Sequence, residues 1–529
     1  MACGLIAGMA VLVCLAAPCH LSQAQTPAPA ATAGDPFSTA GIVPLTPKPG
    51  PAPRINGPKI FGVRPGAPFL YSIPATGNRP MSFSTEGLPA GLQLDAGTGR
   101  IAGVLRAPGE FRVTLRAKNA AGAAEKEFRI VVGETIALTP PMGWNSWNCW
   151  GTSIDQGKIL RAAQAMVAAG LDQHGWSYIN IDDTWQGRRG RPFNAIQPDS
   201  KRFPDMKGLA GKIHALGLKM GIYSTPWVTT YAGHVGGTSE NQDGSWDPAT
   251  LPRNSPFHKD ILPYAVGKYH FATNDAKQWA AWEVDYLKYD WGPIDAAATQ
   301  EMYNALRASG RDVVLSVSNN TSNTLFDVIG EVSKYANCWR VGTDINDSWR
   351  SLVTSGFGHD QWAPYARPGH WNDPDMFEIG AKGGGKPKKL TPDEQYTQVS
   401  LWCLLSAPLL IGCDMEHLDD FTIGLLSNDE VLDINQDALG KQATRVAGGQ
   451  GDLNVYAKPL EDGSWAVGLF NRGGTATTVT VKWSDIGLNG KQMVRDLWRQ
   501  KDLGVFDGQF GVIVAKHGVV LVRIFPAKS

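Results

Sequence analysis

The chain lacks any imbalance of charge. Lysine and arginine together number 49, as do aspartate and glutamate, so the formal net charge of the 529 residues is zero. It also lacks the run of basic residues that marks a polyanion-binding patch. We therefore expect no nucleic-acid partner. The 18 tryptophans against 13 tyrosines suit stacking on the C–H faces of sugars, which favours an uncharged carbohydrate partner.

Motifs for metal sites are also missing. Neither CxxC nor HExxH occurs, so we expect no metal and no cofactor. Three of the seven cysteines lie in the first 24 residues. The other four are scattered among apolar and aromatic neighbours, which predicts buried free thiols, although four cysteines allow three disulfide pairings and fix none. These are Cys149, Cys338, Cys403 and Cys413.

The first residues lack positive charge, because no lysine or arginine precedes Lys48. An apolar run from Leu5 to Ala17, with a small-x-small cleavage site at Ser22-Gln23-Ala24, nevertheless predicts a signal peptide over residues 1–24. We expect a secreted or periplasmic protein with no stable membrane insertion after cleavage. The alternative is an uncleaved anchor, since Ala2–Cys19 is nearly long enough to span a bilayer.

The length predicts two to four domains. Residues 25–53 are rich in alanine, proline and threonine, which predicts a flexible, extended linker. Residues 54–133 alternate with a period of two, as in Phe69–Ile73, and predict a small β-sandwich. Within them, the glycine-rich turns of Gly87–Leu92 and Thr98–Gly103 resemble those of immunoglobulin-like modules that accompany bacterial extracellular enzymes.

Residues 137–437 show a different pattern, in which short apolar runs that end in polar or acidic residues alternate with helical stretches. Ile159–Leu171 is one such stretch, and Thr391–Glu394 is a capping box that opens another. Eight alternations predict a closed (β/α)8 barrel with a parallel sheet. The eight runs are Met142–Trp147, Tyr178–Asp183, Lys219–Ser224, Val284–Asp290, Val313–Ser318, Trp339–Asp344, Gly369–Asp375 and Pro408–Cys413.

Strands return without helices in residues 438–529, which predicts a C-terminal antiparallel β-sandwich. Its last two strands, Val512–Ala515 and Val519–Phe525, flank Lys516–Gly518 as a turn. The predicted fold is therefore a barrel between two β-sandwiches.

Acidic residues gather where the barrel strands end, which is where barrel enzymes place their reactive groups. Strand four ends in Asp290, strand six is followed by Asp344, and strand two closes with Asp182-Asp183. Hydrolysis of a glycosidic bond needs one carboxylate at the anomeric carbon and one carboxyl to protonate the leaving oxygen. Lys288 shares a strand face with Asp290 and is expected to keep it ionised, whereas a drier setting would keep Asp344 protonated.

At these residues the chain resembles the α-galactosidase (melibiase) family, glycoside hydrolase family 27 of clan D, over roughly Leu138–Phe525. The resemblance rests on five motifs in order, which are Met142–Trp147, Ile181–Trp185, Leu287–Asp290, Arg340 with Asp344–Trp349, and Trp371–Met376.

The resemblance implies an exo-acting enzyme that releases terminal α-linked galactose with retention of configuration. Asp290 would be the nucleophile and Asp344 the acid/base. Asp182 and Asp183 would hold O4 and O6 of galactose, and Lys288 would reach O3 and O4. The rest of the implied pocket is Arg340 at the O2 side, Trp147 at the apolar face, and Tyr223 and Asp375 along the wall.

The chain also departs from the family. Many relatives carry Cys-Glu-Trp after strand five, where this chain reads Ser316–Asn320, so we take Asn319 as a pocket residue and expect a roomier site at C2. Thr184 and Trp291 stand where relatives have cysteines of familiar disulfides, and the stretch Pro226–Asn274 is longer and predicts a subsite loop.

Three alternatives stay open. An α-N-acetylgalactosaminidase or a β-L-arabinopyranosidase could use the same scaffold, although the carboxylate of Asp182 suits the hydroxymethyl oxygen that arabinose lacks. A non-catalytic carbohydrate-binding protein is the alternative from another class. The oligomeric state is not predicted.

Overall fold

The computed structural model describes residues 36–245, 265–319, 322–449 and 451–527. The predicted signal peptide, the first part of the linker and the middle of the predicted subsite loop lie outside the described residues. Among the residues described, no helix is long and apolar enough to cross a membrane.

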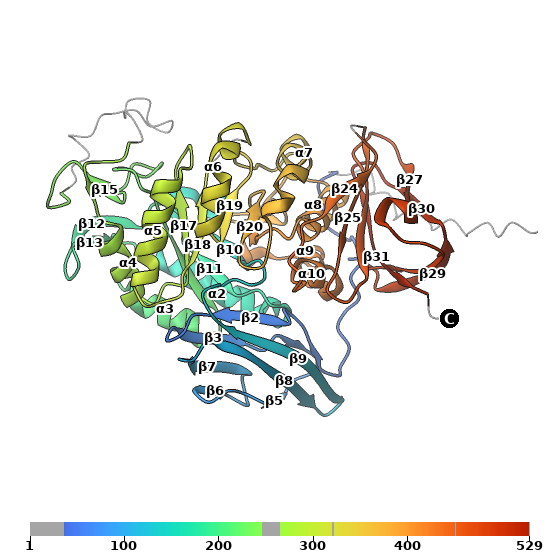
Figure 1. The fold of residues 1–529 in the computed structure, drawn as a ribbon, viewed down its shortest axis with the longest axis horizontal. Coiled ribbons are helices and arrows are strands. Elements are labelled where there is room, and N and C mark those ends of the chain that lie inside the picture. The colour runs from blue at the N-terminus through green and yellow to red at the C-terminus, as the bar shows by residue number, and fades with distance from the viewer. Residues whose placement is uncertain (1–35, 246–264, 320–321, 450, 528–529) are drawn as a thin grey trace, which may run out of the picture. The chain divides into compact units, whose positions relative to one another are not determined.

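Eight parallel strands form the sheet of the central domain (Figure 1). In sheet order they are β20 (Trp371–Asp373), β19 (Cys338–Arg340), β18 (Val314–Ser318), β17 (Tyr286–Asp290), β14 (Lys219–Ser224), β11 (Tyr178–Asn180), β10 (Met142–Asn145) and β23 (Leu409–Ile411). A parallel bridge between Phe377, just after β20, and Ile411 of β23 joins the two ends of this order. The predicted barrel is confirmed, and each predicted apolar run overlaps one strand; β19 begins one residue before its predicted run.

Helices cover the outside of the barrel sheet. The helix that opens with the Thr391–Glu394 capping box is confirmed. The helices are α1 (Trp147–Trp150), α2 (Gln156–Ala168), α3 (Met206–Ala215), α4 (Ala272–Ala281), α5 (Ala296–Ala308), α6 (Ser322–Tyr335), α7 (Trp349–Gly356), α8 (Pro392–Leu404), α9 (Asp420–Leu426) and α10 (Asp429–Asn435).

Side chains inside the barrel form a layer of their own. Tyr178, Tyr286, Val314, Cys338 and Trp371 begin their strands and pack together with Met376 and Leu410. Because successive side chains alternate across a strand, the residues two and four places further on also face the barrel axis. The apolar layer therefore fills the lower barrel, and polar residues follow it towards the carboxyl ends of the strands.

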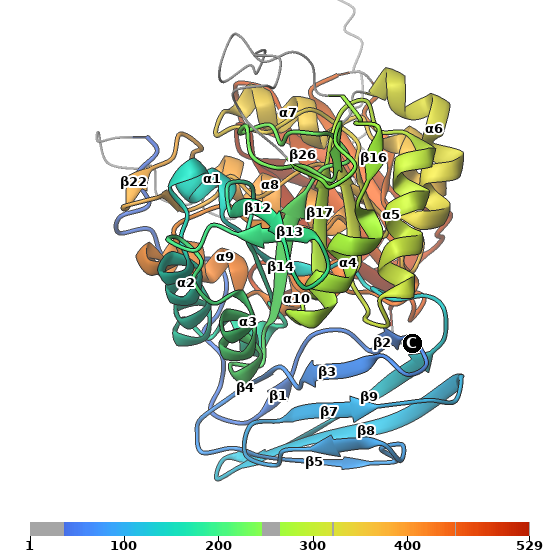
Figure 2. The same cartoon turned by 90° about the vertical axis from the view of Figure 1, so that its left-hand side faces the viewer.

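The N-terminal domain is a two-layered β-sandwich with its own core (Figure 2). One sheet has the order β2 (Ile60–Val63), β9 (Gly122–Val132), β8 (Gly109–Asn119) and β5 (Ser82–Glu86), and the other β3 (Pro68–Ser72), β7 (Arg100–Val104) and β6 (Leu92–Leu94). The short strands β1 (Arg54–Ile55) and β4 (Ala75–Thr76) pair separately.

The C-terminal domain has a six-stranded antiparallel sheet and a two-stranded one. The turn at Lys516–Gly518 is present, but the strands that flank it, β30 and β31, belong to different sheets. The large sheet comprises β24 (Thr444–Ala447), β25 (Leu453–Pro459), β26 (Trp465–Asn471), β31 (Val519–Pro526), β28 (Lys491–Asp496) and β29 (Lys501–Asp507), and the small one β27 (Thr477–Lys482) and β30 (Gln509–Val514).

The described part of the linker corrects the expectation of a free tether. The backbone N–H of Leu45 donates to the Tyr396 hydroxyl at 2.9 Å, and the Thr46 hydroxyl donates to the carbonyl of Gly424 at 2.6 Å. Ile42 and Leu45 also pack against the barrel core. Two apolar side chains and two hydrogen bonds thus fix this stretch along α8 and α9, although its composition is that of a linker.

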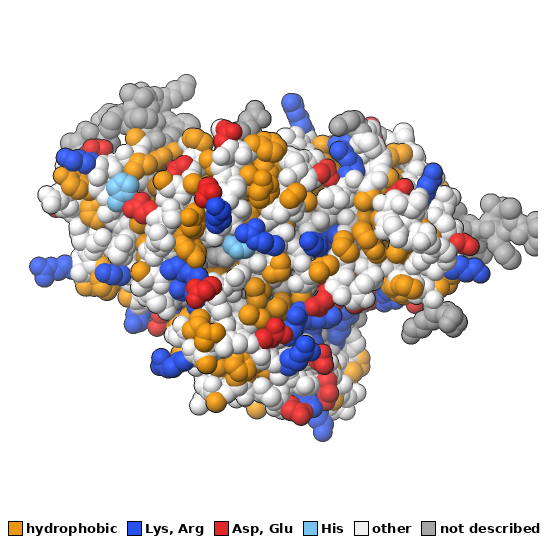
Figure 3. All heavy atoms as spheres, in the orientation of Figure 1, with side chains coloured by type: hydrophobic (Ala, Val, Ile, Leu, Met, Phe, Trp, Pro, Cys, Tyr) orange, Lys and Arg blue, Asp and Glu red, His pale blue; other side chains and the backbone are white. Residues whose placement is uncertain are grey.

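Charged side chains are intermixed in sign over the face drawn in Figure 3. This distribution accords with the zero net charge of the chain.

Candidate active site

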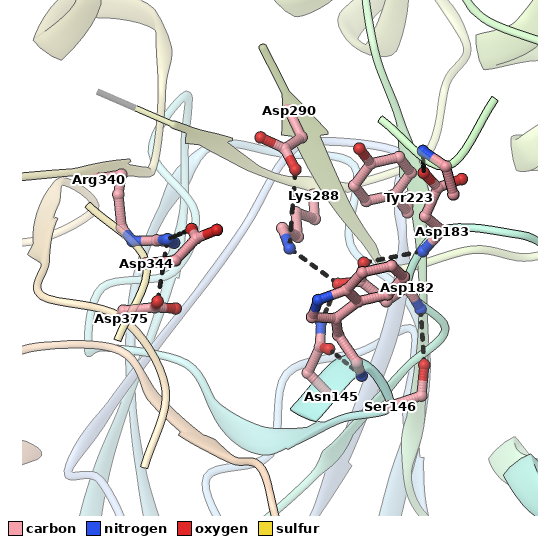
Figure 4. Close-up of polar contacts among 12 residues, drawn as sticks. Asn145, Ser146, Asp182, Asp183, Tyr223, Lys288, Asp290, Arg340, Asp344 and Asp375 are labelled. Carbon is pink, nitrogen blue, oxygen red and sulfur yellow. Dashed lines mark hydrogen bonds and ion pairs between the residues drawn. The ribbon is translucent and has the colours of Figure 1, made fainter. Parts of the chain in front are cut away.

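The predicted site residues that Figure 4 labels lie together at the carboxyl ends of β11, β14, β17, β19 and β20 or in the loops that follow these strands. Two groups face one another across an open region. Asp182, Lys288 and Asp290 belong to one, and Arg340, Asp344 and Asp375 form the other.

Lys288 joins the first group together. On β17 the side chains of Leu287 and Tyr289 point away from the barrel axis and pack in the core that includes the surrounding helices. Lys288 and Asp290 therefore point towards the axis. The Nζ atom of Lys288 lies 2.9 Å from Oδ2 of Asp182 and 3.8 Å from Oδ2 of Asp290. Burial opposes its charge, but Asp182 and Asp290 raise the pKa of Lys288, so it is a cation between two carboxylates.

Asp290 combines burial with an unpaired oxygen. Its side chain is 8% exposed, and its Oδ1 atom is buried without a hydrogen-bond partner among the described residues. The pKa of Asp290 is raised to about 6, and burial is the largest cause. Lys288 acts to lower this pKa, whereas Asp182 and Asp344 act to raise it. Lys288 thus lowers the pKa of Asp290 as expected, but burial has the larger effect and the net shift is upward.

Asp344 lies in a different setting from the predicted one. It lies four residues beyond the end of β19 rather than on the strand, and 73% of its side chain is exposed. Its carboxylate pairs with the guanidinium of Arg340. The protein around Asp344 partly desolvates it, which acts to raise its pKa, but Arg340 and Lys288 outweigh this effect and lower the pKa. The expected dry, protonated state of Asp344 is thus wrong in this structure.

Asp375 supports the same group. It lies 2.9 Å from Arg340 and accepts the backbone N–H of Ile345 at 2.8 Å. Its backbone has φ of 85°, a left-handed conformation that is rare outside glycine. Asp373 accepts the backbone N–H of Asp375 at 2.8 Å, which gives it a structural role beside the pocket.

Asp183 is held by the loop after β14. Its Oδ1 accepts the N–H of Thr184 at 2.6 Å, and its Oδ2 accepts that of Ala232 at 2.9 Å. Burial raises the pKa of Asp183 to about 7 in spite of these bonds. Tyr223, on β14, is 1% exposed, and its hydroxyl has no hydrogen-bond partner among the described residues. The described part of the predicted subsite loop therefore contacts Asp183 through Ala232.

Two further residues complete the pocket. Trp147 opens α1, is partly buried, and packs against the inner barrel cluster. Ser318 ends β18 directly beside Asp290 in register; its side chain is buried, and its Oγ atom has no hydrogen-bond partner in the described chain. Sequence reasoning chose Asn319 instead, which follows the strand and donates its backbone N–H to Trp291 at 3.1 Å. Alternation along β18, where Leu315 and Val317 face outwards, identifies Ser318 as the inward residue.

Carboxylates, a lysine and an arginine converge here. Such groups can carry out acid–base and nucleophilic chemistry on a polyhydroxylated substrate. Within the described ranges, no three histidine, cysteine, aspartate or glutamate side chains are grouped to hold a metal ion. The four described cysteines are buried and free, as predicted.

Comparison with known proteins gives matches over all three domains. The family model described as "Alpha galactosidase A" matches residues 139–247 and 259–437. A model for the α-galactosidase C-terminal β-sandwich domain matches residues 450–524, and one for an Ig domain matches residues 52–133.

Individual relatives agree with the family models. Alpha-galactosidase 2 from Arabidopsis thaliana is 36% identical over 408 residues, which cover 76% of this chain and 93% of that protein. A Bacteroides fragilis structure provisionally assigned as an α-galactosidase has a TM-score of 0.78 and 33% identity, covering 90% of this chain and 98% of that one. A β-L-arabinopyranosidase of glycoside hydrolase family 27 from Geobacillus stearothermophilus has a TM-score of 0.63 and 28% identity, covering 74% and 98%. The chain belongs to the α-galactosidase family of glycoside hydrolases.

Proposed function

We propose that the protein releases terminal α-linked galactose from oligosaccharides or polysaccharides by double displacement, with Asp290 as nucleophile and Asp344 as acid/base. The observation that carries the proposal is Asp290 itself. It is a buried carboxylate at a strand end, with one unpaired oxygen and a cation 3.8 Å from the other. Membership of the α-galactosidase family supports the choice of galactose.

The first chemical step forms a bond between Asp290 Oδ1 and the anomeric carbon while the glycosidic C–O bond breaks. The leaving oxygen takes its proton from Asp344. In the second step Asp344 removes a proton from water, the water oxygen attacks the anomeric carbon, and the bond to Asp290 breaks. Two inversions at one carbon give net retention.

The sugar contacts are part of the same proposal. Asp182 and Asp183 would accept hydrogen bonds from O4 and O6, and Lys288 would donate to O3 and O4. Arg340 would lie at the O2 side, and the indole of Trp147 would cover the apolar face of the ring. Tyr223 and Asp375 would line the pocket.

The assay compares purified wild-type protein and Asp290→Ala on nitrophenyl α-galactoside and nitrophenyl β-L-arabinopyranoside. We expect turnover of the galactoside and its loss in the variant, with NMR showing the α-anomer as the first product. An inverted product, or full turnover by the variant, would contradict the proposal. The pentoside is expected to react more slowly, because Asp182 and Asp183 would face no hydroxymethyl group.

Ser318 supports a second candidate, an α-N-acetylgalactosaminidase. The departure from the family at strand five leaves a small side chain beside Asp290, with an unpaired hydroxyl. A larger substituent at C2 would fit more readily beside serine than beside glutamate. The ratio of kcat/KM for nitrophenyl α-N-acetylgalactosaminide and nitrophenyl α-galactoside decides between the two substrates.

Export is also a proposal. The apolar run Leu5–Ala17 and the small-x-small site at Ser22–Ala24 support a cleaved signal and a secreted or periplasmic location. N-terminal sequencing of the exported protein would test it, and an intact N-terminus in the membrane fraction would favour the anchor.

A further inference from the structure

One turn of the C-terminal domain contacts two helices of the barrel next to the proposed site. The imidazole of His517, between β30 and β31, stacks on Trp349 with ring centroids 4.1 Å apart and an interplanar angle of 13°. Its Nδ1 atom lies 2.6 Å from Oε1 of Glu394, and its carbonyl accepts the Thr397 hydroxyl at 2.7 Å. One residue thus bridges the first residue of α7 and the first turns of α8.

We propose that His517 is a positioning residue for the proposed acid/base Asp344, and that the C-terminal domain thereby takes part in catalysis. The inference rests on the proposed function. It concerns the loop of residues 341–348, which joins β19 to α7 and carries Asp344.

The loop is held on the barrel side by Val341 and Ile345, whose side chains are buried. The backbone N–H of Val341 donates to the carbonyl of Asp373 at 3.0 Å, and that of Ile345 donates to the carboxylate of Asp375 at 2.8 Å. Asp347 pairs with Lys382 at 2.7 Å; the Asp347 side chain is 13% exposed and that of Lys382 is 38% exposed. The far end of the loop is fixed where α7 begins, at Trp349, and this is the ring that His517 covers.

The contact lies at the end of the loop that carries Asp344. His517 is 18% exposed, so the stacked pair lies near the protein surface, and Trp349 also packs against the barrel core. Asp344 is itself largely exposed and paired with Arg340. Its position during proton transfer therefore depends on where the loop backbone is held, and an error of about 1 Å in such a group can cost about a hundredfold in rate.

Glu394 shows why a histidine suits the position. It is 6% exposed and closes the capping box of α8 with Thr391, so its location is fixed. It accepts from Nδ1 while the imidazole plane lies on the indole. The backbone of His517 has φ of 55°, a conformation that histidine and asparagine adopt more readily than most residues.

The test uses His517→Asn, because asparagine tolerates the backbone and can offer its amide to Glu394 but has no ring for Trp349. The readout is kcat/KM on two galactosides. Departure of methanol from methyl α-galactoside needs protonation, whereas departure of dinitrophenolate from 2,4-dinitrophenyl α-galactoside does not. We expect about a tenfold loss on the methyl galactoside and less than about a twofold loss on the dinitrophenyl galactoside, since general-acid catalysis contributes about 10²–10⁴-fold.

Trp349→Leu removes the other half of the stack and is expected to give the same change of ratio, with little further change in the double variant. Lys516→Ala, an exposed neighbour in the same turn, is the matched control and should leave the ratio unchanged. Equal losses on both substrates, or no loss, in His517→Asn and Trp349→Leu would overturn the inference.

Asp344→Ala separates this outcome from failure of the proposed function. It should show the largest selective loss on the methyl galactoside. If it shows no selectivity, Asp344 is not the acid and the proposed function fails with the inference. If Asp344→Ala is selective and the stacking variants are not, the inference about His517 alone is wrong.

Discussion

Replacing the proposed nucleophile with its neutral isostere should stabilise the protein. Asp290 is buried, and burial raises its pKa from 3.8 to about 6, so its charge is less favourable in the folded chain than in the unfolded one. Each tenfold change in an ionisation constant is worth about 1.4 kcal/mol, which makes the cost of this charge about 3 kcal/mol at neutral pH. Asp290→Asn should recover about 1–3 kcal/mol of it, and the lower end applies if the amide packs poorly.

Lys288 does not lose its main partner in this variant. Its Nζ atom stays 2.9 Å from Asp182, compared with 3.8 Å from Asp290. The gain should therefore appear as a rise of about 2–5 °C in the apparent Tm at pH 7.5, measured at one scan rate because unfolding of a chain this size is often irreversible.

The pH dependence gives the effect its sign. A carboxyl whose pKa is raised on folding binds its proton more tightly in the folded chain, so its destabilising charge is fully present above pH 6 and disappears as the pH falls towards 4. The Tm difference between Asp290→Asn and wild type should shrink over the same range. A variant less stable than wild type at pH 7.5, or a difference independent of pH, would refute the reasoning.

Asp285 is the matched control, because it directly precedes the same strand and is also buried. Burial acts to raise its pKa, but His214 and Arg311 outweigh burial, and the pKa of Asp285 is lowered. Its carboxylate is 2.7 Å from Nε2 of His214 and 2.5 Å from Nη2 of Arg311. Asp285→Asn should therefore lower the Tm. A rise in Tm for Asp290→Asn and a fall for Asp285→Asn would distinguish relief of a buried charge from loss of polar contacts.

Four other substitutions have defined outcomes. Lys288→Met should move the acidic limb of the kcat/KM profile above pH 6, because Lys288 lowers the pKa of Asp290; an unmoved limb would contradict this electrostatic role. Gly143→Ala should destabilise the barrel by about 1–3 kcal/mol in a urea titration, because the new Cβ would meet the backbone of β11. Gly330→Ala, at an exposed position of α6 with open space around it, should instead stabilise the protein by about 0.5–1 kcal/mol in the same titration. Ser318→Glu should lower kcat/KM for N-acetylgalactosaminides relative to galactosides, and an unchanged ratio would mean that β18 does not contact C2.

The barrel was predictable from sequence because its signals are local. Each strand is a short apolar run, and its last inward residue follows from a period of two, which places Lys288 and Asp290 on one face without coordinates. Lys219–Ser224 was predicted to the residue. Where a run continued into a polar loop, as after Arg340, apolar character did not mark the end of the strand, and the prediction extended to Asp344.

The exposure and contacts of a side chain were less predictable than its place on a strand, because they depend on residues far away in the sequence. Nothing near Asp344 indicates that its side chain is exposed beside Arg340 rather than enclosed. The stretch from Ile42 to Thr46 has the composition of a linker, and only the distant partners Tyr396 and Gly424 hold it. Ser318 was predictable from the sequence, because its inward direction follows from alternation along β18. The prediction of Asn319 followed the family's Cys-Glu-Trp segment and did not use this alternation.

The pKa shifts of the two proposed catalytic carboxyls run against their roles. Burial raises that of the nucleophile Asp290 to about 6, while Arg340 and Lys288 lower that of the acid Asp344. A bound galactoside would change the pKa of both carboxyls. It would cover the exposed Asp344 and place the glycosidic oxygen beside it, and loss of water raises the pKa of a carboxyl. Sugar hydroxyls that donate to Asp182 would weaken its hold on Lys288, which frees the cation to favour the charge on Asp290. We therefore expect the order of ionisation that the proposed double displacement needs to arise in the complex with the sugar, where the acid would be protonated next to the leaving oxygen.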